Sequence, residues 1–175
     1  MSTIKKLIVI FILGFLLRIL LIPVAYHGDL NNNISWGNAA IEKGLIGYYD
    51  SPSVDGWKFS APNQPPLYIL LFTLTSFVYK NLDNLFRFLN NAISFFPSGI
   101  IWFWELKGMI YLVKLPSIFA DIGIGYLLYK YFKNNKRLAL LIPTIWLFNP
   151  VIWYNSAIWG QTDAVVNFLG LLAIF

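Results

Sequence analysis

Asp29 is the residue of this chain best placed for acid–base chemistry. It lies within residues 26–36 (YHGDLNNNISW), which follow an apolar run and open a long polar and aromatic loop. A carboxylate at the edge of a bilayer, poised by partial desolvation, could deprotonate a water-soluble hydroxyl group while a second substrate stays in lipid. The plainer interpretation is that Asp29 is the N-cap of a helix through Trp36. The spacing alone leaves both interpretations open.

Three further ionisable residues lie inside apolar runs. Arg18 lies about 10 Å below the outer end of the first run, at 1.5 Å per residue, and Lys114 and Asp121 share one face of a later run. Charged groups in a bilayer usually face protein or a wet cavity. Arg18 could pair with Asp121 and join the first two spans, or Arg18 or Lys114 could meet a lipid phosphate. Lys114 could instead extend its ammonium group to the interface.

Residues 159–163 (WGQTD) form a second candidate site. The Trp159 ring offers a flat face for stacking on a sugar, and Gln161 and Asp163 offer groups that bind hydroxyls. The same residues could instead form a helix stop at Gly160 and a cap at Thr162 or Asp163. If the site binds a sugar, we expect this loop and Asp29 to converge on one external cavity.

The composition argues against an ordinary soluble domain. Hydrophobic residues make up 58% and charged residues 12%, whereas about a quarter of an ordinary domain is charged. The net charge of +5 comes from scattered basic residues, so we expect no nucleic-acid partner. The chain has no cysteine and a single histidine, His27, and its carboxylates lack the close spacing of a cation site. We therefore predict no metal site.

Apolar runs predict an all-α integral membrane protein. Residues 4–25, 109–132 and 138–154 are long enough, or nearly so, to cross about 30 Å of hydrocarbon. A fourth run begins near residue 164 and is still apolar at 175, after about twelve of the roughly 20 residues that a full crossing needs. We therefore expect an incomplete fourth span, and a chain that is the front part of a larger protein.

The basic residues predict the topology. The positive-inside rule places two basic clusters in the cytoplasm. One cluster is Lys5 with Lys6, and the other is the loop with Lys133, Lys136 and Arg137. An even number of crossings must then separate the clusters, so the ambiguous stretches 65–79 and 92–104 either both cross or both lie in the interface. Their shortness and neighbouring charges favour interfacial helices. Residues 26–108 would then form one external loop, and residues 155–163 would return to the side of Asp29.

The order of these motifs resembles the start of the GT-C glycosyltransferases. The motifs are a span followed by Gly28-Asp29 and a nearby Trp, a helix at Pro65-Pro66-Leu67-Tyr68, a Lys-Leu-Pro…Ala-Asp span at 114–121, and an Asn149-Pro150…WGQTD loop. The resemblance covers nearly the whole chain. It is closest to bacterial and archaeal membrane proteins related to the enzyme that adds the second mannose of GPI anchors. The dolichyl-phosphate-glucose glucosyltransferases are more distantly similar.

The resemblance implies a GT-C-like fold with interfacial helices in the long first external loop. It implies inverting transfer of a hexose, with mannose expected, from a polyprenyl-phosphate donor to a glycan, lipid or protein acceptor. Asp29 would be the catalytic base, and Trp159, Gln161 and Asp163 would shape the sugar pocket. Lys114 and Arg18 would be substrate-binding residues. No metal or cofactor is expected, because basic side chains can stabilise a monophosphate leaving group.

Family members run to several hundred residues, and their later helices supply part of the donor site. We therefore expect residues 1–175 to be the N-terminal part of a single GT-C-like domain and to be inactive alone. The expected location is the plasma membrane, as a multi-pass protein among membrane lipids, or the ER membrane in a eukaryote. The alternatives are a transporter or flippase of lipid-linked sugars and a noncatalytic membrane subunit. Transporter sites usually lie near the midplane, whereas the polar residues here gather at one interface.

Overall fold

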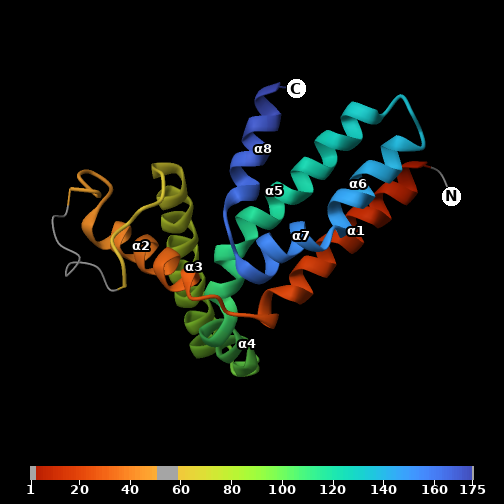
Figure 1. The fold of residues 1–175 in the computed structure, drawn as a ribbon. Coiled ribbons are helices and arrows are strands. Elements are labelled where there is room, and N and C mark those ends of the chain that lie inside the picture. Colours follow the sequence, from red (N-terminus) through yellow and green to blue (C-terminus); the bar gives the residue numbers. More distant parts are fainter. Residues whose placement is uncertain (1–2, 51–58, 175) are drawn as a thin grey trace. The chain divides into compact units, whose positions relative to one another are not determined.

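A computed structural model of the protein describes residues 3–50 and 59–174. Of the described residues 80% are helical and none lies in a strand, as the apolar runs predict. The part of the predicted external loop at residues 51–58 lies outside the described residues. The chain divides into two compact units. We call Met1–Tyr26 with Lys114–Phe175 the span unit, and His27–Val113 the loop unit (Figure 1).

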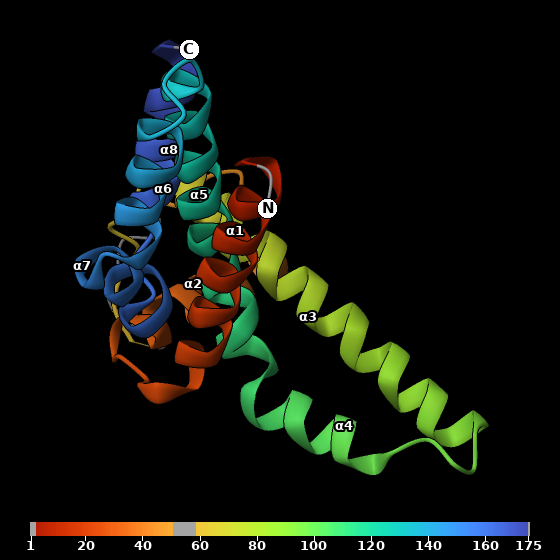
Figure 2. The same ribbon diagram turned by 90° about the vertical axis from the view of Figure 1, so that its right-hand side faces the viewer.

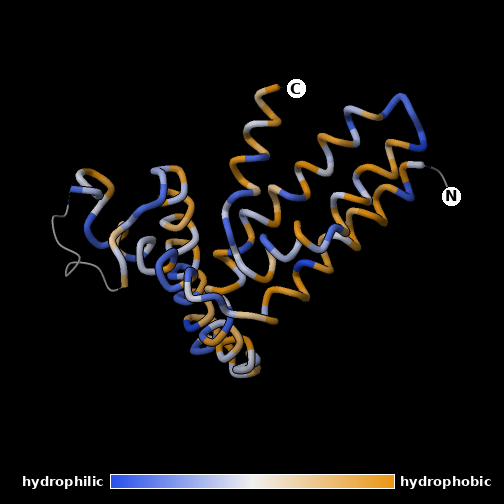
Figure 3. The backbone as a smooth tube through the Cα atoms, viewed as in Figure 1, coloured by the Kyte–Doolittle hydropathy of each residue, from blue (hydrophilic) through white to orange (hydrophobic). Residues whose placement is uncertain are grey.

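The span unit is built on three long helices that run side by side in Figure 1. They are α1 (Thr3–Leu21), which continues into the 3-10 turn η1 (Ile22–Val24), α5 (Met109–Phe132), whose first residues belong to the loop unit, and α6 (Leu138–Phe148). Leu147 of α6 is fully buried and packs against Gly14 of α1 and Gly125 of α5. Small residues at these positions let apolar helices approach closely. Figure 3 shows apolar residues spread along α1 and α6, with polar residues at the turn between α5 and α6.

The predicted span at residues 138–154 is not continuous. After α6 the chain bends by 46° and continues as α7 (Pro150–Trp153) and the π-helical turn η4 (Tyr154–Trp159). Asn149 before the proline is extended, with ψ of 122°, because a residue before proline disfavours helical backbone. Its side chain accepts a hydrogen bond from the Val151 amide at 2.9 Å and starts the new helix. The proline therefore breaks the run that we expected to cross in one piece.

Two helical runs among the described residues are long and apolar enough to cross a membrane. They are Thr3–Val24 and Ser98–Phe132, and α6 with the bent segment after it makes a third if the pair counts as one broken span. The second run starts before the predicted residue 109, because α4 (Ser98–Phe103) and the π-helical turn η3 (Trp104–Gly108) lead into α5. The last helix, α8 (Asp163–Ile174), has 12 residues. The protein therefore has the helices of a membrane protein.

The loop unit packs α2 (Asp29–Lys43) against α3 (Pro66–Ala92). The proline pair starts α3 as predicted, but the helix continues well beyond the apolar stretch 65–79. Gly37 allows the close contact, since a Cβ atom there would lie 2.3 Å from the Phe72 carbonyl oxygen. The buried core consists of Leu30, Trp36, Ala40, Tyr48, Tyr68, Ile69, Phe72 and Val113.

The far half of α3 pairs with the segment before α5. Figure 2 shows α3 and α4 as the two arms of a hairpin. The Tyr79 ring stacks on Trp104 with centroids 5.2 Å apart, and Arg87 bonds both Asp83 at 2.9 Å and Glu105 at 2.6 Å. α3 is not among the helices apolar enough to cross a membrane within the described ranges. The interfacial position of this hairpin stays a prediction.

Candidate functional site

Asp29 is the first residue of α2, and Gly28 is the N-cap. The N-cap interpretation of Asp29 is therefore wrong by one residue, and the helix runs past Trp36 to Lys43. A carboxylate in the first helical turn interacts favourably with the helix dipole, which gives Asp29 a structural role. Its side chain is 52% exposed, and Oδ2 lies 3.7 Å from Nδ1 of His27. The carboxylate is thus open to a partner from solvent, and its role as a base stays a prediction.

Arg18 and Asp121 form a buried ion pair in the span unit. Arg18 Nε donates to Asp121 Oδ2 at 3.1 Å, and the two side chains are 0% and 2% exposed. Nη1 of Arg18 donates to the carbonyl oxygens of Gly14 and Leu147, at 3.0 and 2.8 Å. The predicted pairing of Arg18 with Asp121 is confirmed, and it joins α1 to α5 with a further bond to α6.

Ser156 extends this ion pair to η4. Its hydroxyl donates to Asp121 Oδ2 at 2.6 Å, and the Trp146 indole N–H donates to the Asp121 backbone carbonyl at 3.0 Å. Among the described residues, Nη2 of Arg18 is buried without a hydrogen-bond partner. Asp121 is therefore the point where α1, α5 and η4 are held together.

Lys114 is fully buried, so the structure does not show the alternative in which its ammonium group extends to the interface. Its Nζ donates to three backbone carbonyl oxygens, those of Ile22 at 3.0 Å, Ala25 at 3.1 Å and Ile158 at 2.7 Å. Carbonyls at helix C-termini lack helical partners and carry partial negative charge, and an ammonium group has three protons to donate. These contacts give Lys114 a structural role. Phosphate binding by Lys114 or Arg18 stays a prediction.

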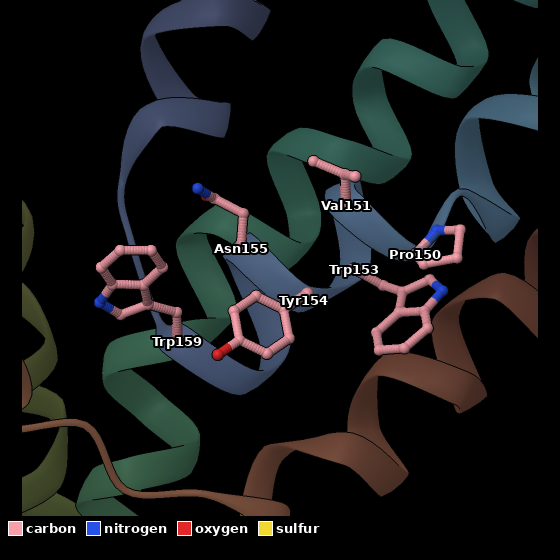
Figure 4. Close-up of a pocket in the computed structure, with 6 residues that line it drawn as sticks. All are labelled: Pro150, Val151, Trp153, Tyr154, Asn155 and Trp159. Carbon is pink, nitrogen blue, oxygen red and sulfur yellow. The ribbon is translucent and has the colours of Figure 1, made fainter.

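An aromatic pocket lies where the helix is broken. It has a volume of about 360 Å³ and is lined by Pro150, Val151, Trp153, Tyr154, Asn155 and Trp159. Figure 4 shows the rings of Trp153, Tyr154 and Trp159 projecting from the short helical segment. The Tyr154 and Trp159 rings meet edge to face, with centroids 6.4 Å apart. The pocket thus offers aromatic surface at one end of the span unit.

The pocket surface is almost entirely apolar, and Asn155 is its one residue with a polar side chain besides the aromatic ones. Nδ2 of Asn155 lies 3.4 Å from Oδ2 of Asp163, which is exposed and begins α8. Gly160 takes a left-handed conformation with φ of 87° and ends η4, so the predicted helix stop is confirmed. Thr162 is buried. An amide and a carboxylate beside aromatic rings can bind a ligand with an apolar face and hydroxyl groups.

The sequence-predicted site residues fall into the two units. Arg18, Lys114, Trp159, Gln161 and Asp163 belong to the span unit, and Asp29 belongs to the loop unit. The expected convergence of Asp29 with the 159–163 loop therefore stays a prediction. Sequence reasoning missed Trp153 and Tyr154 as pocket residues, although the density of aromatic residues near Trp159 was a usable signal.

The described residues contain no group of three or more His, Cys, Asp or Glu side chains that could hold a metal ion. No protein-family model, curated protein or solved structure matches the chain. The functional argument therefore rests on the residues and their geometry.

Proposed function

We propose that this protein is part of a membrane glycosyltransferase of the GT-C type. It transfers a hexose, with mannose as the expected sugar, from a polyprenyl-phosphate donor to a hydroxyl group of an acceptor on the external face. The acceptor oxygen forms a bond to the anomeric carbon, and the bond from that carbon to the phosphate oxygen breaks, with inversion. Asp29 takes the hydroxyl proton, and polyprenyl phosphate leaves with the bonding electrons.

The aromatic pocket is the observation that carries this proposal. Tyr154 and Trp159 present ring surface on which the apolar face of a pyranose can stack. The pocket surface is almost entirely apolar, and the hydroxyl groups of the sugar would have to reach Asn155 and Asp163, which bond each other at 3.4 Å at its edge. The pocket adjoins apolar helices of spanning length, which suits a donor whose tail stays in lipid. The exposed carboxylate of Asp29 supplies the acid–base group that transfer to a hydroxyl requires.

Transfer assays in membranes test this function. Membranes of cells that express the whole gene would receive labelled polyprenyl-phosphate mannose or glucose, and product formation would be followed for the wild type and for Asp29→Asn. We expect transfer from one donor by the wild type and its loss in Asp29→Asn, because an amide cannot accept the proton. Loss of a general base lowers rates by about 10²–10⁴-fold.

Glu42→Gln is the matched control, since it neutralises an exposed carboxylate of the same helix. It should transfer at the wild-type rate. Equal turnover by Asp29→Asn and the wild type would remove Asp29 from the chemistry. Absence of turnover with either donor would contradict the proposed function.

One observation favours a transporter of lipid-linked sugars as the second candidate. The chain bends by 46° between α6 and α7, and broken helices near buried ionisable residues are typical of transporter sites. A transporter would move labelled donor across a proteoliposome membrane without forming a glycosylated product. Flipping without transfer would therefore favour the second candidate over the first.

A further inference from the structure

Three buried polar residues of α5 hold the segment that carries the aromatic pocket. Lys114, Ser117 and Asp121 lie three and four residues apart, on one face of the helix, and are 0%, 1% and 2% exposed. We call them the α5 clamp. Each bonds to a different point of residues 156–161: Asp121 to Ser156 at 2.6 Å, Lys114 to Ile158 at 2.7 Å and Ser117 to Gln161 at 2.6 Å.

This segment needs support from outside itself. η4 is a π-helical turn, and the Gly160 and Gln161 amides both donate to the Asn155 carbonyl at 3.0 Å. The carbonyl oxygens of Ile158 and Gln161 accept hydrogen bonds from the clamp. In apolar surroundings, a carbonyl without a donor is costly. The clamp therefore holds the backbone on both sides of Trp159.

Ser117 differs from its two neighbours in the clamp. Lys114 also bonds the end of α1 and its following turn through Ile22 and Ala25, and Asp121 also pairs with Arg18. Among the described residues, the Ser117 hydroxyl makes one hydrogen bond, to the Gln161 carbonyl. Ser117 can therefore be changed without removing a bond between α1 and α5.

We propose that Ser117 is a positioning residue, which fixes the Gln161 backbone and, two residues before it, Trp159 for the hexose of the donor. The activity test of this inference rests on the proposed function, whereas the structural test does not depend on it. Ser117 touches no substrate. It acts by holding the Gln161 backbone, so that the Trp159 ring keeps its orientation in the pocket before a ligand arrives.

The structural readout is fluorine NMR of the full chain, labelled with fluorotryptophan in lipid nanodiscs. The signal absent from Trp159→Phe identifies Trp159. We expect this signal to shift and broaden in Ser117→Ala and to return to the wild-type position in Ser117→Thr, which keeps the hydroxyl. Thr144→Val is the matched control, because it removes another hydroxyl-to-carbonyl bond of the span unit, 2.6 Å long and within α6.

The activity readout is the donor dependence of transfer in membranes of cells that express the whole gene. Loss of one neutral hydrogen bond that orients a binding residue should raise KM for the donor by roughly fivefold and change kcat less. Ser117→Thr should restore KM, and Thr144→Val should leave it unchanged. An unchanged Trp159 signal in Ser117→Ala would overturn the inference, as would equal shifts in Ser117→Ala and Thr144→Val. If the wild type transfers from neither donor, the proposed function fails, and the Trp159 signal still decides whether Ser117 positions the ring.

Discussion

The two units of the protein handle charge in opposite ways. In the span unit Arg18, Lys114 and Asp121 are almost completely buried. In the loop unit the ion pairs of Arg87 lie at the surface, with 52% of the arginine side chain exposed. Lipid cannot solvate an ion, so charges among apolar helices must find protein partners. The buried charges of the span unit therefore all have protein partners, whereas the ion pairs of the loop unit lie at its surface.

The units also use their aromatic residues differently. In the loop unit Trp36 and Tyr48 are core residues whose polar tips donate to the carbonyl oxygens of Ser60 and Trp36, both at 2.7 Å. In the span unit Trp153, Tyr154 and Trp159 line an open pocket. Aromatic density alone does not distinguish these uses. The pocket gives the span unit aromatic surface that a ligand could contact.

Thiol labelling tests the predicted topology of the loop unit, and it should give the largest effect. Ile46→Cys places a thiol at a fully exposed position of the loop unit, and Asn135→Cys places one at an exposed position between α5 and α6. By the positive-inside rule we expect an impermeant thiol reagent to label the two from opposite sides of the membrane. The wild type is the control, because it has no cysteine. Labelling of both from one side would contradict the predicted topology.

Removal of one buried charge should cost the span unit the most stability. Asp121→Leu leaves Arg18 buried without its counter-charge, and breaking a buried pair in this way costs about 3–5 kcal/mol. Thermal unfolding in detergent measures the loss. The double variant Arg18→Met with Asp121→Leu should recover part of it, because neither charge remains buried.

Arg87→Ala is the control from the loop unit, and it should change the unfolding temperature little, since exposed ion pairs are screened by solvent. An Asp121→Leu variant as stable as Arg87→Ala would remove the contrast between the two units.

Gly37→Ala tests the contact that holds the loop unit together. A Cβ atom there would meet the Phe72 backbone carbonyl at 2.3 Å, and α2 must move away from α3 to relieve the contact. Overpacking of this kind costs about 1–3 kcal/mol. Gly99→Ala is the matched control, since nothing lies within 4 Å of its added Cβ. Equal melting temperatures for the two variants in circular dichroism would count against the packing described for α2 and α3.

Tyr48 should give the loop unit a pH dependence at high pH. Burial, with a smaller contribution from Tyr49, raises the pKa of Tyr48 from 10.0 to about 12. Below pH 10 the Tyr48 hydroxyl keeps its proton in both the folded and the unfolded chain, and its contribution to the stability of the folded chain is complete. Between pH 10 and about pH 12 the unfolded chain loses this proton and the folded chain keeps it, so the stability of the folded chain falls as pH rises.

Tyr48→Phe should remove this contribution and cost about 1 kcal/mol near neutral pH, because the bond to the Trp36 carbonyl is lost. Unfolding of both proteins across this pH range, followed by circular dichroism, measures the effect. Parallel pH profiles would show that Tyr48 does not carry the dependence.

Sequence reasoning succeeded where the signal was local. Apolar runs predicted the helical class and the bounds of α5, and the proline pair predicted the start of α3. It failed at Asn149-Pro150, because length and hydropathy outweighed the known effect of a proline on the preceding residue. It also missed the burial of Lys114, since three carbonyl acceptors on two other segments cannot be read from one helix.

The sequence by itself determined the helical class, the apolar runs of α1 and α5, and that Arg18 and Asp121 are suitable partners. These properties depend on composition and on periodicity along a few turns. Only the tertiary structure decided that Ser156, 35 residues from Asp121, completes their buried network, and that Ser117 holds Gln161. Such contacts depend on how helices pack after the chain bends, and packing brings together side chains whose separation along the chain carries no signal.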